Sequence, residues 1–492
     1  MKKMNLLAMS LVSAAALSFS SCSSNDDLTS GGGSNQSKVE SFYMTFAVQT
    51  PTSNGTRTQQ PTDANFKVAG TSAETTITSG TFYLVNQKTN KTVFTKHITA
   101  SELNNAAPES PVKGTTTTKI EVPVQDVDEG VTYTVYFLAN TTDATPWTSV
   151  FAPAAEKFTT TNMFDAGYAT ANNFVMFNQN DKNSKADKYT VEFKADNKDI
   201  SNAAKVNGTI MLDRVTARID KPTTVEGITI TAKYPEGATA EKKAAIDAEI
   251  AKVKTVTQSN YAITNLSNKT NIMQKWDDAT WTALQLPTDN AYMQKSGDLG
   301  DQWTLKNYGW FANAEKNYVF ENTKETPTTM YFEYVLGLDE TKFSDTPDCT
   351  DGTFYRYNGV IYRSIAAIYA AYADQPILFG GKTAEALKGE LKIADGKITA
   401  TDAELAKFRK DNVIEVFVAG KTYYSQVITD KWLGTNTIQR NTVYQLNVKN
   451  IYNLGADVPN GKPDENKPMY YLDVEVSVNP WVLSTQDVNL GE

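Results

Sequence analysis

Hydrophobic and polar residues alternate with a period of two along many short stretches of this chain. In residues 40–48, apolar side chains on one face alternate with smaller or polar side chains on the other. Such alternation is typical of a β-strand with one buried face. The same pattern recurs through the rest of the sequence, at residues 81–85, 131–138, 189–193, 208–219, 228–234, 329–335, 413–418, 442–448 and 470–478. The sequence therefore predicts a mainly β protein.

Helical periodicity is confined to a few segments. Residues 239–253 begin with Thr239, a favourable N-cap residue, and carry Ile246, Ile250 and Val253 on one stripe. Two shorter helical candidates lie at residues 364–372 and 402–409. We therefore expect β-sandwiches with a few short helices in their connections.

The length of the chain predicts more than one domain. Its 492 residues are enough for two or three domains, and 40% of them are hydrophobic, as expected for a folding chain. After the strand pattern that ends near residue 220, the polar stretch KPTTVEG reads as a linker. We therefore expect two tandem β-sandwich domains, residues 58–222 and 223–480, with a junction near residue 222.

Charge and the scarcity of His and Cys argue against several classes of function. A net charge of −9 without a basic block argues against nucleic acid as a partner. The chain has one His, His97, and two Cys, Cys22 and Cys349. A catalytic triad, a zinc site or a disulfide framework cannot easily be built from so few residues. We expect no enzyme, no cofactor and no metal site, with His97 structural or solvent-facing and Cys349 a free thiol.

Two local clusters remain as weaker candidates. Asp345, Asp348 and Asp351 could together ligate a cation, although their spacing matches no EF-hand loop. An aromatic cluster could form a sugar platform, although packing in a core or loop is the favoured interpretation; it consists of Trp303, Tyr308, Trp310 and Phe311. No pair of carboxylates for glycoside hydrolysis can be identified from one sequence.

The N-terminus has the pattern of an export signal. Lys2 and Lys3 precede an apolar run that is too short to span a membrane, so residues 1–21 read as a signal peptide. The sequence FSSC, which ends at Cys22, resembles a bacterial lipoprotein box with Cys22 as the acylated (palmitate-bearing) residue. Residues 23–38 follow as a Ser-, Gly- and Asn-rich tether. The alternative is an ordinary signal peptide followed by an incidental Cys.

Several stretches follow one another in a family-specific order. They are the lipoprotein-like Cys22, SFYMTFAVQTPTSNGTR at 41–57, DRVTARID at 213–220, YVFENT at 318–323, RNTVYQLNV at 440–448 and VEVSVNPW at 474–481. Together they resemble the fimbrillins of Bacteroidales, the major structural subunits of type V pili, and most of all the short-fimbria, Mfa-like branch. The resemblance implies transthyretin-like, Greek-key β-sandwiches in a cell-surface fimbrium that supports adhesion and biofilm formation.

The resemblance also implies an assembly mechanism. In this family an Arg-specific or trypsin-like protease cuts the lipoprotein precursor at the outer membrane, and the first strand leaves its groove. The C-terminal strand of a neighbouring subunit then fills that groove by donor-strand exchange. The implied partners are other copies of the chain, accessory tip and anchor pilins, the protease, and the outer membrane through the lipid of the precursor.

Given the cleavage that the resemblance implies, the local sequence favours one position. Arg57 lies in a polar segment that contains Pro51, Gly55 and Pro61, and such segments favour proteolysis. The next Arg along the chain, Arg214, lies inside a predicted strand. We therefore predict a cut between Arg57 and Thr58, which removes residues 22–57 as a propeptide. The alternatives are a trypsin-like cut after a nearby Lys and an uncut Arg57 in a solvated loop.

The resemblance also identifies a displaced strand and a donated strand. The departing strand, residues 39–49, has an apolar face made of Phe42, Met44, Phe46 and Val48. Removing it would expose apolar surface and unpaired strand edges that another strand could cover. The donor candidate is residues 481–492, which follow Pro480, a residue that tends to end strands. Its apolar residues are Trp481, Val482, Leu483, Val488 and Leu490.

Alternatives remain open for both strands and for the function. Residues 39–49 can instead be an ordinary permanent strand. The C-terminus can be a closing strand of its own domain or a tail without fixed structure. At the level of function, the alternatives are a pilus tip or anchor subunit, a glycan-binding surface lipoprotein, and a surface glycosidase.

Overall fold

The computed structural model describes most of the chain beyond residue 39. The described residues are 40–49, 68–104, 115–140, 154–156, 168–182, 184–277, 280–305, 315–375, 377–461 and 471–483. Several predicted features lie outside these residues, namely residues 1–21, Cys22, the Arg57–Thr58 bond, Val488, Leu490, Tyr308, Trp310 and Phe311.

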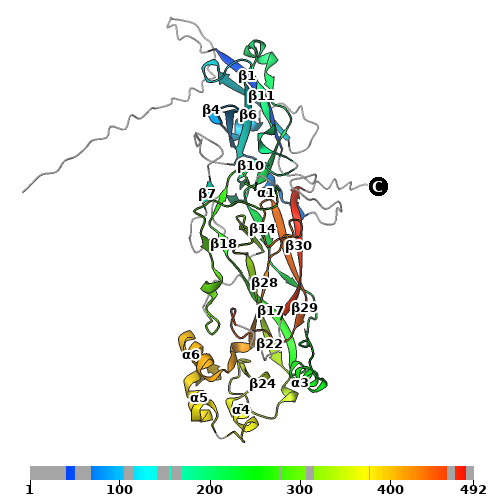
Figure 1. Ribbon diagram of the computed structural model, residues 1–492, viewed down its shortest axis with the longest axis vertical. Helices are drawn as coiled ribbons and strands as arrows, with labels where there is room; N and C mark the ends of the chain where they lie inside the picture. The colour runs from blue at the N-terminus through cyan, green and yellow to red at the C-terminus, as the bar shows by residue number, and fades with distance from the viewer. Residues whose placement is uncertain are drawn as a thin grey trace, which may run out of the picture. The chain divides into compact units, whose positions relative to one another are not determined.

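Strands dominate the described residues, so the prediction of a mainly β fold is confirmed (Figure 1). The strands up to residue 214 are β1 (Ser41–Gln49), β2 (Val68–Gly70), β3 (Gly80–Asn86), β4 (Lys91–Ile98), β5 (Thr115–Pro123), β6 (Thr132–Ala139), β7 (Ala154–Glu156), β8 (Ala169–Thr170), β9 (Asn173–Phe174), β10 (Met176–Asn178), β11 (Thr190–Glu192), β12 (Ala204–Lys205) and β13 (Ile210–Arg214). Most of them form a nine-stranded sheet with the order β12–β1–β13–β10–β6–β3–β4, in which β5 also pairs with β1 and β11 with β6.

The later strands build a second large sheet and several small ones. They are β14 (Ala217–Asp220), β15 (Thr223–Thr224), β16 (Ile230–Thr231), β17 (Val253–Thr264), β18 (Leu266–Ser267), β19 (Lys269–Asn271), β20 (Tyr292–Met293), β21 (Lys316–Val319), β22 (Thr329–Leu338), β23 (Phe354–Tyr357), β24 (Val360–Tyr362), β25 (Ile393–Ala394), β26 (Lys397–Ile398), β27 (Glu415–Phe417), β28 (Lys421–Val427), β29 (Thr442–Tyr452) and β30 (Tyr471–Leu483). A seven-stranded sheet has the order β2–β30–β29–β14–β21, with β15 and β16 also on β29. A three-stranded sheet, β17–β22–β28, contributes to the same core.

One predicted strand proves to be two. The alternating pattern of residues 208–219 is divided between β13, in the nine-stranded sheet, and β14, in the seven-stranded sheet. Buried apolar residues fall on even positions in β13, such as Leu212, and on odd positions in β14, such as Ile219. The prediction of a single strand was therefore wrong, because the chain passes from one sheet to the other at Val215 and Thr216.

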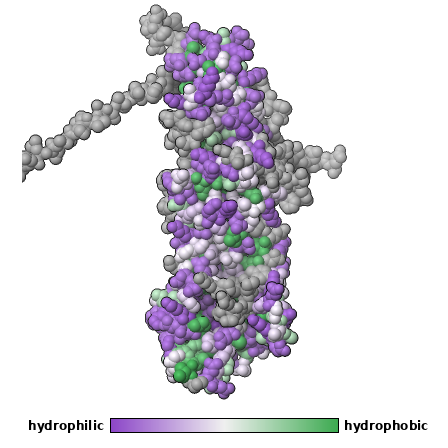
Figure 2. All heavy atoms as spheres, in the orientation of Figure 1, coloured by the Kyte–Doolittle hydropathy of each residue, from purple (hydrophilic) through white to green (hydrophobic). Residues whose placement is uncertain are grey.

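Two large hydrophobic cores accompany the two large sheets. The first draws on residues 42–212 together with Val443, and the second on residues 217–472. On the face shown in Figure 2, hydrophilic residues dominate and hydrophobic residues stand in small groups, as expected when most apolar side chains are buried. The division into two tandem domains, with limits at residues 222 and 480, stays a prediction.

The α-helices are α1 (Ser72–Thr75), α2 (Ala100–Asn104), α3 (Ala240–Ile250), α4 (Ile365–Ala371), α5 (Ala384–Leu391) and α6 (Asp402–Asn412). The three predicted helices are confirmed as α3, α4 and α6, and their N-caps are Thr239, Ser364 and Thr401. Val253, which we expected on the stripe of α3, instead begins β17. α4, α5 and α6 gather around a third hydrophobic core together with β23 and β27 (Figure 1).

Short 3-10 helices complete the connections. They are η2 (Val124–Asp126), η3 (Ala186–Lys188), η4 (Ala195–Lys198), η5 (Ile200–Asn202), η6 (Ser296–Leu299), η7 (Glu340–Lys342), η8 (Phe379–Gly381) and η9 (Val418–Gly420). Within the described residues, no helix has both the length and the apolar character needed to cross a membrane.

Candidate assembly site

The first strand, β1, is an interior strand of its sheet. On one side it pairs antiparallel with β5 over its whole length, from Ser41 opposite Pro123 to Gln49 opposite Thr115. On the other side it pairs in parallel with β12 and β13. Within the described part of the chain, β5 pairs with no other strand. Loss of β1 would therefore leave open backbone edges on both sides of one slot.

The four apolar side chains that the sequence places on one face of β1 are all buried. Phe42, Met44, Phe46 and Val48 are each at most 2% exposed. The Phe46 ring packs against two others in the first core, with its centroid 5.1 Å from that of Phe82 and 5.5 Å from that of Phe137. Burying four such side chains contributes roughly 6–12 kcal/mol before the cost of ordering the strand. Whether β1 is displaced on maturation stays a prediction.

Polar contacts at the start of β1 add little to the stability of β1 in its slot. Glu40 accepts a hydrogen bond from Lys198 Nζ at 3.2 Å, and both side chains are exposed. Such exposed ion pairs contribute at most about 1 kcal/mol. The apolar face and the two hydrogen-bonded edges therefore account for most of the stability of β1 in its slot.

The C-terminal strand, β30, continues beyond the proline that we expected to end it. Pro480 lies opposite Thr442 in the last pair of the antiparallel ladder with β29. The next residues pair in parallel with β2, with Trp481 opposite Val68 and Leu483 opposite Gly70. The expectation that Pro480 ends the strand was wrong, because the strand changes partners at this position and Pro480 stands at the end of a ladder.

The predicted donor segment is thus divided into two parts. Trp481, Val482 and Leu483 belong to a strand that pairs within their own chain. Residues 484–492, with Val488 and Leu490, lie outside the described residues. The first part is a closing strand in this structure, and donation of the tail to a neighbour stays a prediction.

Three of the sequence stretches that carry the family resemblance meet where the chain passes between the sheets. Asn441, just before β29, accepts a hydrogen bond from Arg214 Nη1 at 2.7 Å. Its own Nδ2 donates to Asp213 Oδ1 at 3.1 Å. From the third stretch, Glu321 forms an ion pair with Arg440 at 2.7 Å. All five residues are at most 3% exposed, so the contacts form a buried structural joint.

The electrostatics of this joint reflect its burial. Burial raises the pKa of Asp213 well above its usual value, and the nearby charge of Asp181 raises it further. Burial also lowers the pKa of Arg214 to about 9, although the charges of Glu74 and Asp213 oppose the change. Charges this deep are costly unless they are paired, so the joint favours one arrangement of the strands that carry it.

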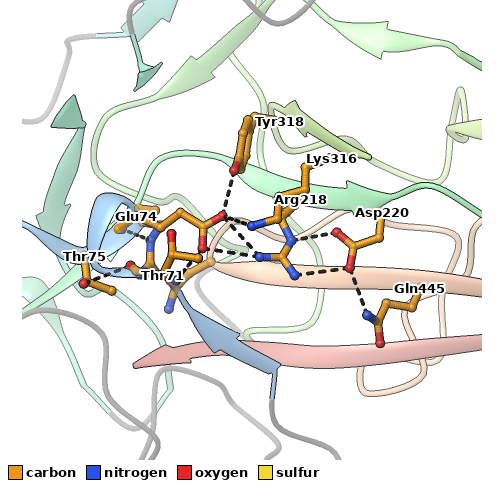
Figure 3. A network of polar contacts seen from close by, with 10 residues as sticks. Thr71, Glu74, Thr75, Arg218, Asp220, Lys316, Tyr318 and Gln445 are labelled. Carbon is orange, nitrogen blue, oxygen red and sulfur yellow. Dashed lines mark hydrogen bonds and ion pairs between the residues drawn. The ribbon is translucent and has the colours of Figure 1, made fainter. Parts of the chain in front are cut away.

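A second buried network lies beside the first and includes the start of the described chain after β1 (Figure 3). Glu74 on α1 accepts hydrogen bonds from Tyr318 OH at 2.7 Å and from Lys316 Nζ at 3.1 Å. It also forms an ion pair with Arg218 at 3.2 Å. This network ties the segment that follows the predicted cleavage position to β14 and β21.

The other candidates from the sequence take structural positions. His97 lies on β4, with Nδ1 3.3 Å from the hydroxyl of Thr81. Cys349 is buried, and burial together with the charges of Asp351 and Asp348 raises the pKa of its thiol to about 11. At neutral pH this thiol is protonated, which makes it a poor nucleophile.

The acidic loop around Cys349 binds protein donors. Asp345 accepts a hydrogen bond from Ser364 Oγ, Asp348 from the amide of Ile365, and Asp351 from the amide of Thr353. Among the described residues, no group of three or more His, Cys, Asp or Glu side chains is arranged to hold a metal ion. Of the aromatic cluster, Trp303 is described, and its carbonyl oxygen accepts a hydrogen bond from Arg409 Nη1.

Sequence reasoning missed Glu74 and the residues that bind it. One local signal was present, since residues 71–74 read Thr-Ser-Ala-Glu, the pattern of a helix capping box. The amide of Thr71 indeed donates to Glu74 Oε2 at 2.7 Å. The pattern predicts the start of a helix, but it gives no sign that the carboxylate also binds residues 144 and more positions away.

The C-terminal region matches the model of a known protein family. Residues 415–487 match the model described as "Major fimbrial subunit protein type IV, Fimbrillin, C-terminal". These residues contain β27 to β30, including the strand pair β29–β30. No curated protein matches the chain.

Several solved structures are similar to the chain over most of its length. The fimbrilin (fimA) from Porphyromonas gingivalis W83 is 14% identical, with 91% of this chain and 100% of that one covered and a TM-score of 0.42. The tip fimbrial protein Mfa3 from Porphyromonas gingivalis, with a C-terminal truncation, is 12% identical, with 90% and 100% covered and a TM-score of 0.32. A fimbrial assembly protein from Parabacteroides distasonis ATCC 8503 is 13% identical, with 61% and 99% covered and a TM-score of 0.28.

Proposed function

We propose that this chain, whose C-terminal region belongs to the fimbrillin family of major fimbrial subunits, is a structural stalk subunit of a cell-surface fimbrium. It is exported as a lipoprotein precursor with Cys22 as the lipidated residue, cut after Arg57, and polymerised head to tail by donor-strand exchange. Other copies of the chain and accessory tip and anchor pilins are its partners in the fibre, which supports adhesion and biofilm formation.

The observation that carries the proposal is the position of β1. It fills a slot between β5 on one side and β12 and β13 on the other, and its apolar face is fully buried. It is also the first strand of the described chain, and Arg57 follows it in the sequence. A single cut after Arg57 would therefore separate β1 from the rest of the subunit without breaking any described strand.

The tail has the length to replace β1. β1 has nine residues, and residues 484–492 are also nine in number, so each spans about 30 Å when extended. The tail is less apolar, because Val488 and Leu490 replace four buried side chains on the equivalent face. It therefore cannot displace β1 by affinity alone, and proteolysis supplies the direction by removing the competitor.

The repeat of this contact produces a filament. The slot and the tail are different surfaces of one subunit, so the contact between neighbours is heterologous, and heterologous contacts that do not close into a ring propagate without limit. The main-chain hydrogen bonds of a shared strand give the contact its affinity, and the pockets left by the apolar face of β1 give it its register.

N-terminal sequencing of subunits from assembled fibres tests the proposal directly. We expect Thr58 as the first residue, and we expect Arg57→Ala to leave an uncut, membrane-associated precursor and few fibres. Arg57→Lys separates the two protease classes, because a trypsin-like enzyme cuts after Lys and an Arg-specific enzyme does not. Normal fibres made of uncut Arg57→Ala subunits would contradict the mechanism.

A further inference from the structure

We propose that β2 and α1 form a clip that fixes the point at which the C-terminal tail leaves the subunit, and that Glu74 fastens this clip. The clip comprises residues 68–75. The role of the tail rests on the proposed function above. The clip itself is a property of the single subunit and can be tested without any polymer.

The clip holds the last described residues of the chain. β2 is the edge strand of the seven-stranded sheet and pairs in parallel with the end of β30. The register places Val68, Ala69 and Gly70 opposite the first three residues of the predicted donor segment. Within the described residues, β2 pairs with no other strand. A three-residue edge strand has too few hydrogen bonds to stay in place by itself, so it needs an anchor.

The anchor is the single turn of helix α1. A helix this short is not stable by itself. Glu74 lies on this turn and is 2% exposed. Its carboxylate binds three side chains from two neighbouring strands, namely Arg218 on β14 and Lys316 and Tyr318 on β21 (Figure 3). The same carboxylate accepts a hydrogen bond from the amide of Thr71, which closes the turn that follows β2.

The backbone of α1 is held as well. The carbonyl oxygen of Glu74 accepts a hydrogen bond from Arg214 Nε at 2.7 Å. Glu74 therefore holds the clip in place through both its side chain and its main chain. Arg218 is in turn fixed by Asp220, whose Oδ1 lies 2.7 Å from Arg218 Nε. Gln445 on β29 donates to Asp220 Oδ2 at 2.9 Å, so the network reaches the strand that pairs with β30.

These contacts make the clip hard to open. Arg218 is 4% exposed, so movement of α1 would leave a buried guanidinium without its Glu74 partner. Loss of one partner from a buried ionic network is unfavourable, because Asp220 would then be the remaining carboxylate that pairs with this guanidinium out of water. The clip therefore stays on β30 for as long as Glu74 stays ionised and in place.

Cleavage gives the clip its importance. In the precursor, β2 is connected through the chain to β1, which is anchored in the first core. After a cut at Arg57, β2 lies ten residues from the new N-terminus at Thr58, so the chain no longer connects it to β1, and only its link to α1 and its non-covalent contacts hold it. The Glu74 network allows β1 to leave while β2 remains on the end of β30. The tail then begins after Leu483, whose position the clip fixes.

A fixed starting point favours exchange. If the clip opened, residues 481–483 would lose their pairing with β2 and lengthen the segment that has to be ordered when the tail enters a neighbouring slot. Ordering a segment on binding costs conformational entropy, and preorganisation reduces that cost. Opening of the clip should therefore slow assembly even though no residue of the clip enters the neighbouring slot.

The chain offers a matched control in Glu102. Residues 99–102 read Thr-Ala-Ser-Glu, and the amide of Thr99 donates to Glu102 Oε2 at 2.7 Å, just as in the clip. The Glu102 side chain is 40% exposed, and its ion pair with Lys96 at 3.3 Å is a surface contact. Glu102→Gln therefore makes the same chemical change in the same local motif, away from β30.

Hydrogen–deuterium exchange of the full chain, before and after cleavage at Arg57, tests the clip. For Glu74→Gln we expect amide exchange at least tenfold faster over residues 68–70 and 481–483, and unchanged exchange in the β3–β6 ladder. Glu102→Gln should leave residues 481–483 as in the wild type. Unchanged protection of these residues in Glu74→Gln would overturn the clip.

Two further measurements separate the possible outcomes. If Glu74→Gln loses protection throughout the chain, Tyr318→Phe takes its place as the test variant. This change removes one hydrogen bond to Glu74 and should still make amide exchange faster at residues 481–483. Unchanged exchange there would overturn the clip. Fibre growth should be severalfold slower with Glu74→Gln than with Glu102→Gln. Faster exchange with wild-type growth would overturn the guiding role. If fibres form without any tail, the proposed function fails, while the exchange result still decides the clip.

Discussion

Arg214 Nη1 donates a hydrogen bond to Asn441 Oδ1 over 2.7 Å, although the two residues are 227 positions apart in the sequence. Arg214 ends β13, and Asn441 stands immediately before β29. Asn441 has a φ of 54°, a left-handed conformation that Asn adopts more readily than most residues. Its amide also donates to Thr216 O at 2.8 Å. One residue thus connects the end of the first large sheet to the start of the strand at the centre of the second.

Replacement of Asn441 should therefore destabilise the whole chain. Asn441→Ala removes the buried hydrogen bond from Arg214 Nη1 and the one to Asp213 Oδ1, and it places Ala at a positive φ, so we expect a loss of about 3 kcal/mol in the free energy of unfolding. Asn447→Ala on the same strand is the control, because Asn447 bonds Thr223 near the surface and should cost less than about 1 kcal/mol. Urea unfolding measures both, and equal losses would contradict the structural role of the joint.

Local sequence signals predicted local structure well. Helices are present at the three segments where we predicted them, 239–253, 364–372 and 402–409, and Thr239, the predicted N-cap, accepts a hydrogen bond from the amide of Lys242. The alternation in residues 40–48 likewise predicted which face of β1 is buried. These features depend on neighbours within a few positions, and such neighbours can be read directly from the sequence.

The failures share a different physical cause. The alternation of residues 208–219 continues across a change of sheet, so periodicity alone did not reveal that Arg214 and Arg218 turn inward to distant partners. Pro480 disfavours a strand on propensity, but its place at the end of a ladder removes the penalty. Both outcomes depend on tertiary pairing, which a single sequence does not display.

Truncation of Phe46 should weaken the precursor and leave the mature subunit unchanged. Phe46 contacts the rings of Phe82 and Phe137 in the first core, so Phe46→Ala creates a cavity and should lower the stability of the uncut chain by about 3–5 kcal/mol. Thr45→Ala, on the other face of β1, should cost less than about 1 kcal/mol. After cleavage and departure of β1, Phe46→Ala and wild-type subunits should unfold alike. A persistent difference would show that β1 stays in place.

Deletion of the tail should separate folding from assembly. Because β30 ends at Leu483 in the described structure, a stop after residue 483 keeps the pairing with β2 intact. We expect this variant to fold with wild-type stability and to form no fibres, as measured by thermal unfolding and by electron microscopy of surface fractions. A stop after residue 480 should in addition expose residues 68–70 to amide exchange, because β2 loses its partner. Wild-type fibre yield after the first deletion would remove the donor role from the tail.

Glu74 should make the stability of the chain depend on pH in the acid range. Burial by itself raises the pKa of this carboxyl, but hydrogen bonds from Tyr318 and Thr71 and the charge of Arg218 together lower it to about 2. A lowered folded-state pKa stabilises the fold above the unfolded value near 4.5, and this contribution is lost as the pH falls from about 5 to about 2. The contribution at neutral pH is on the order of 3 kcal/mol.

Comparison of wild type with Glu74→Gln isolates this contribution from other titrations. The charged or titratable groups around Glu74 are Arg214, Arg218, Asp220, Lys316 and Tyr318. All five groups are present in both wild type and Glu74→Gln, so their own contributions cancel when the two chains are compared.

Asp213 contributes the opposite slope. Its pKa is raised by burial, so its effect stabilises the fold at low pH and is lost as the pH rises. It is present in both chains and cancels in the difference. Urea unfolding at several pH values should therefore show wild type more stable than Glu74→Gln at pH 7, with the gap closing toward pH 3. A gap that stays constant with pH would mean that Glu74 acts by shape and not by charge.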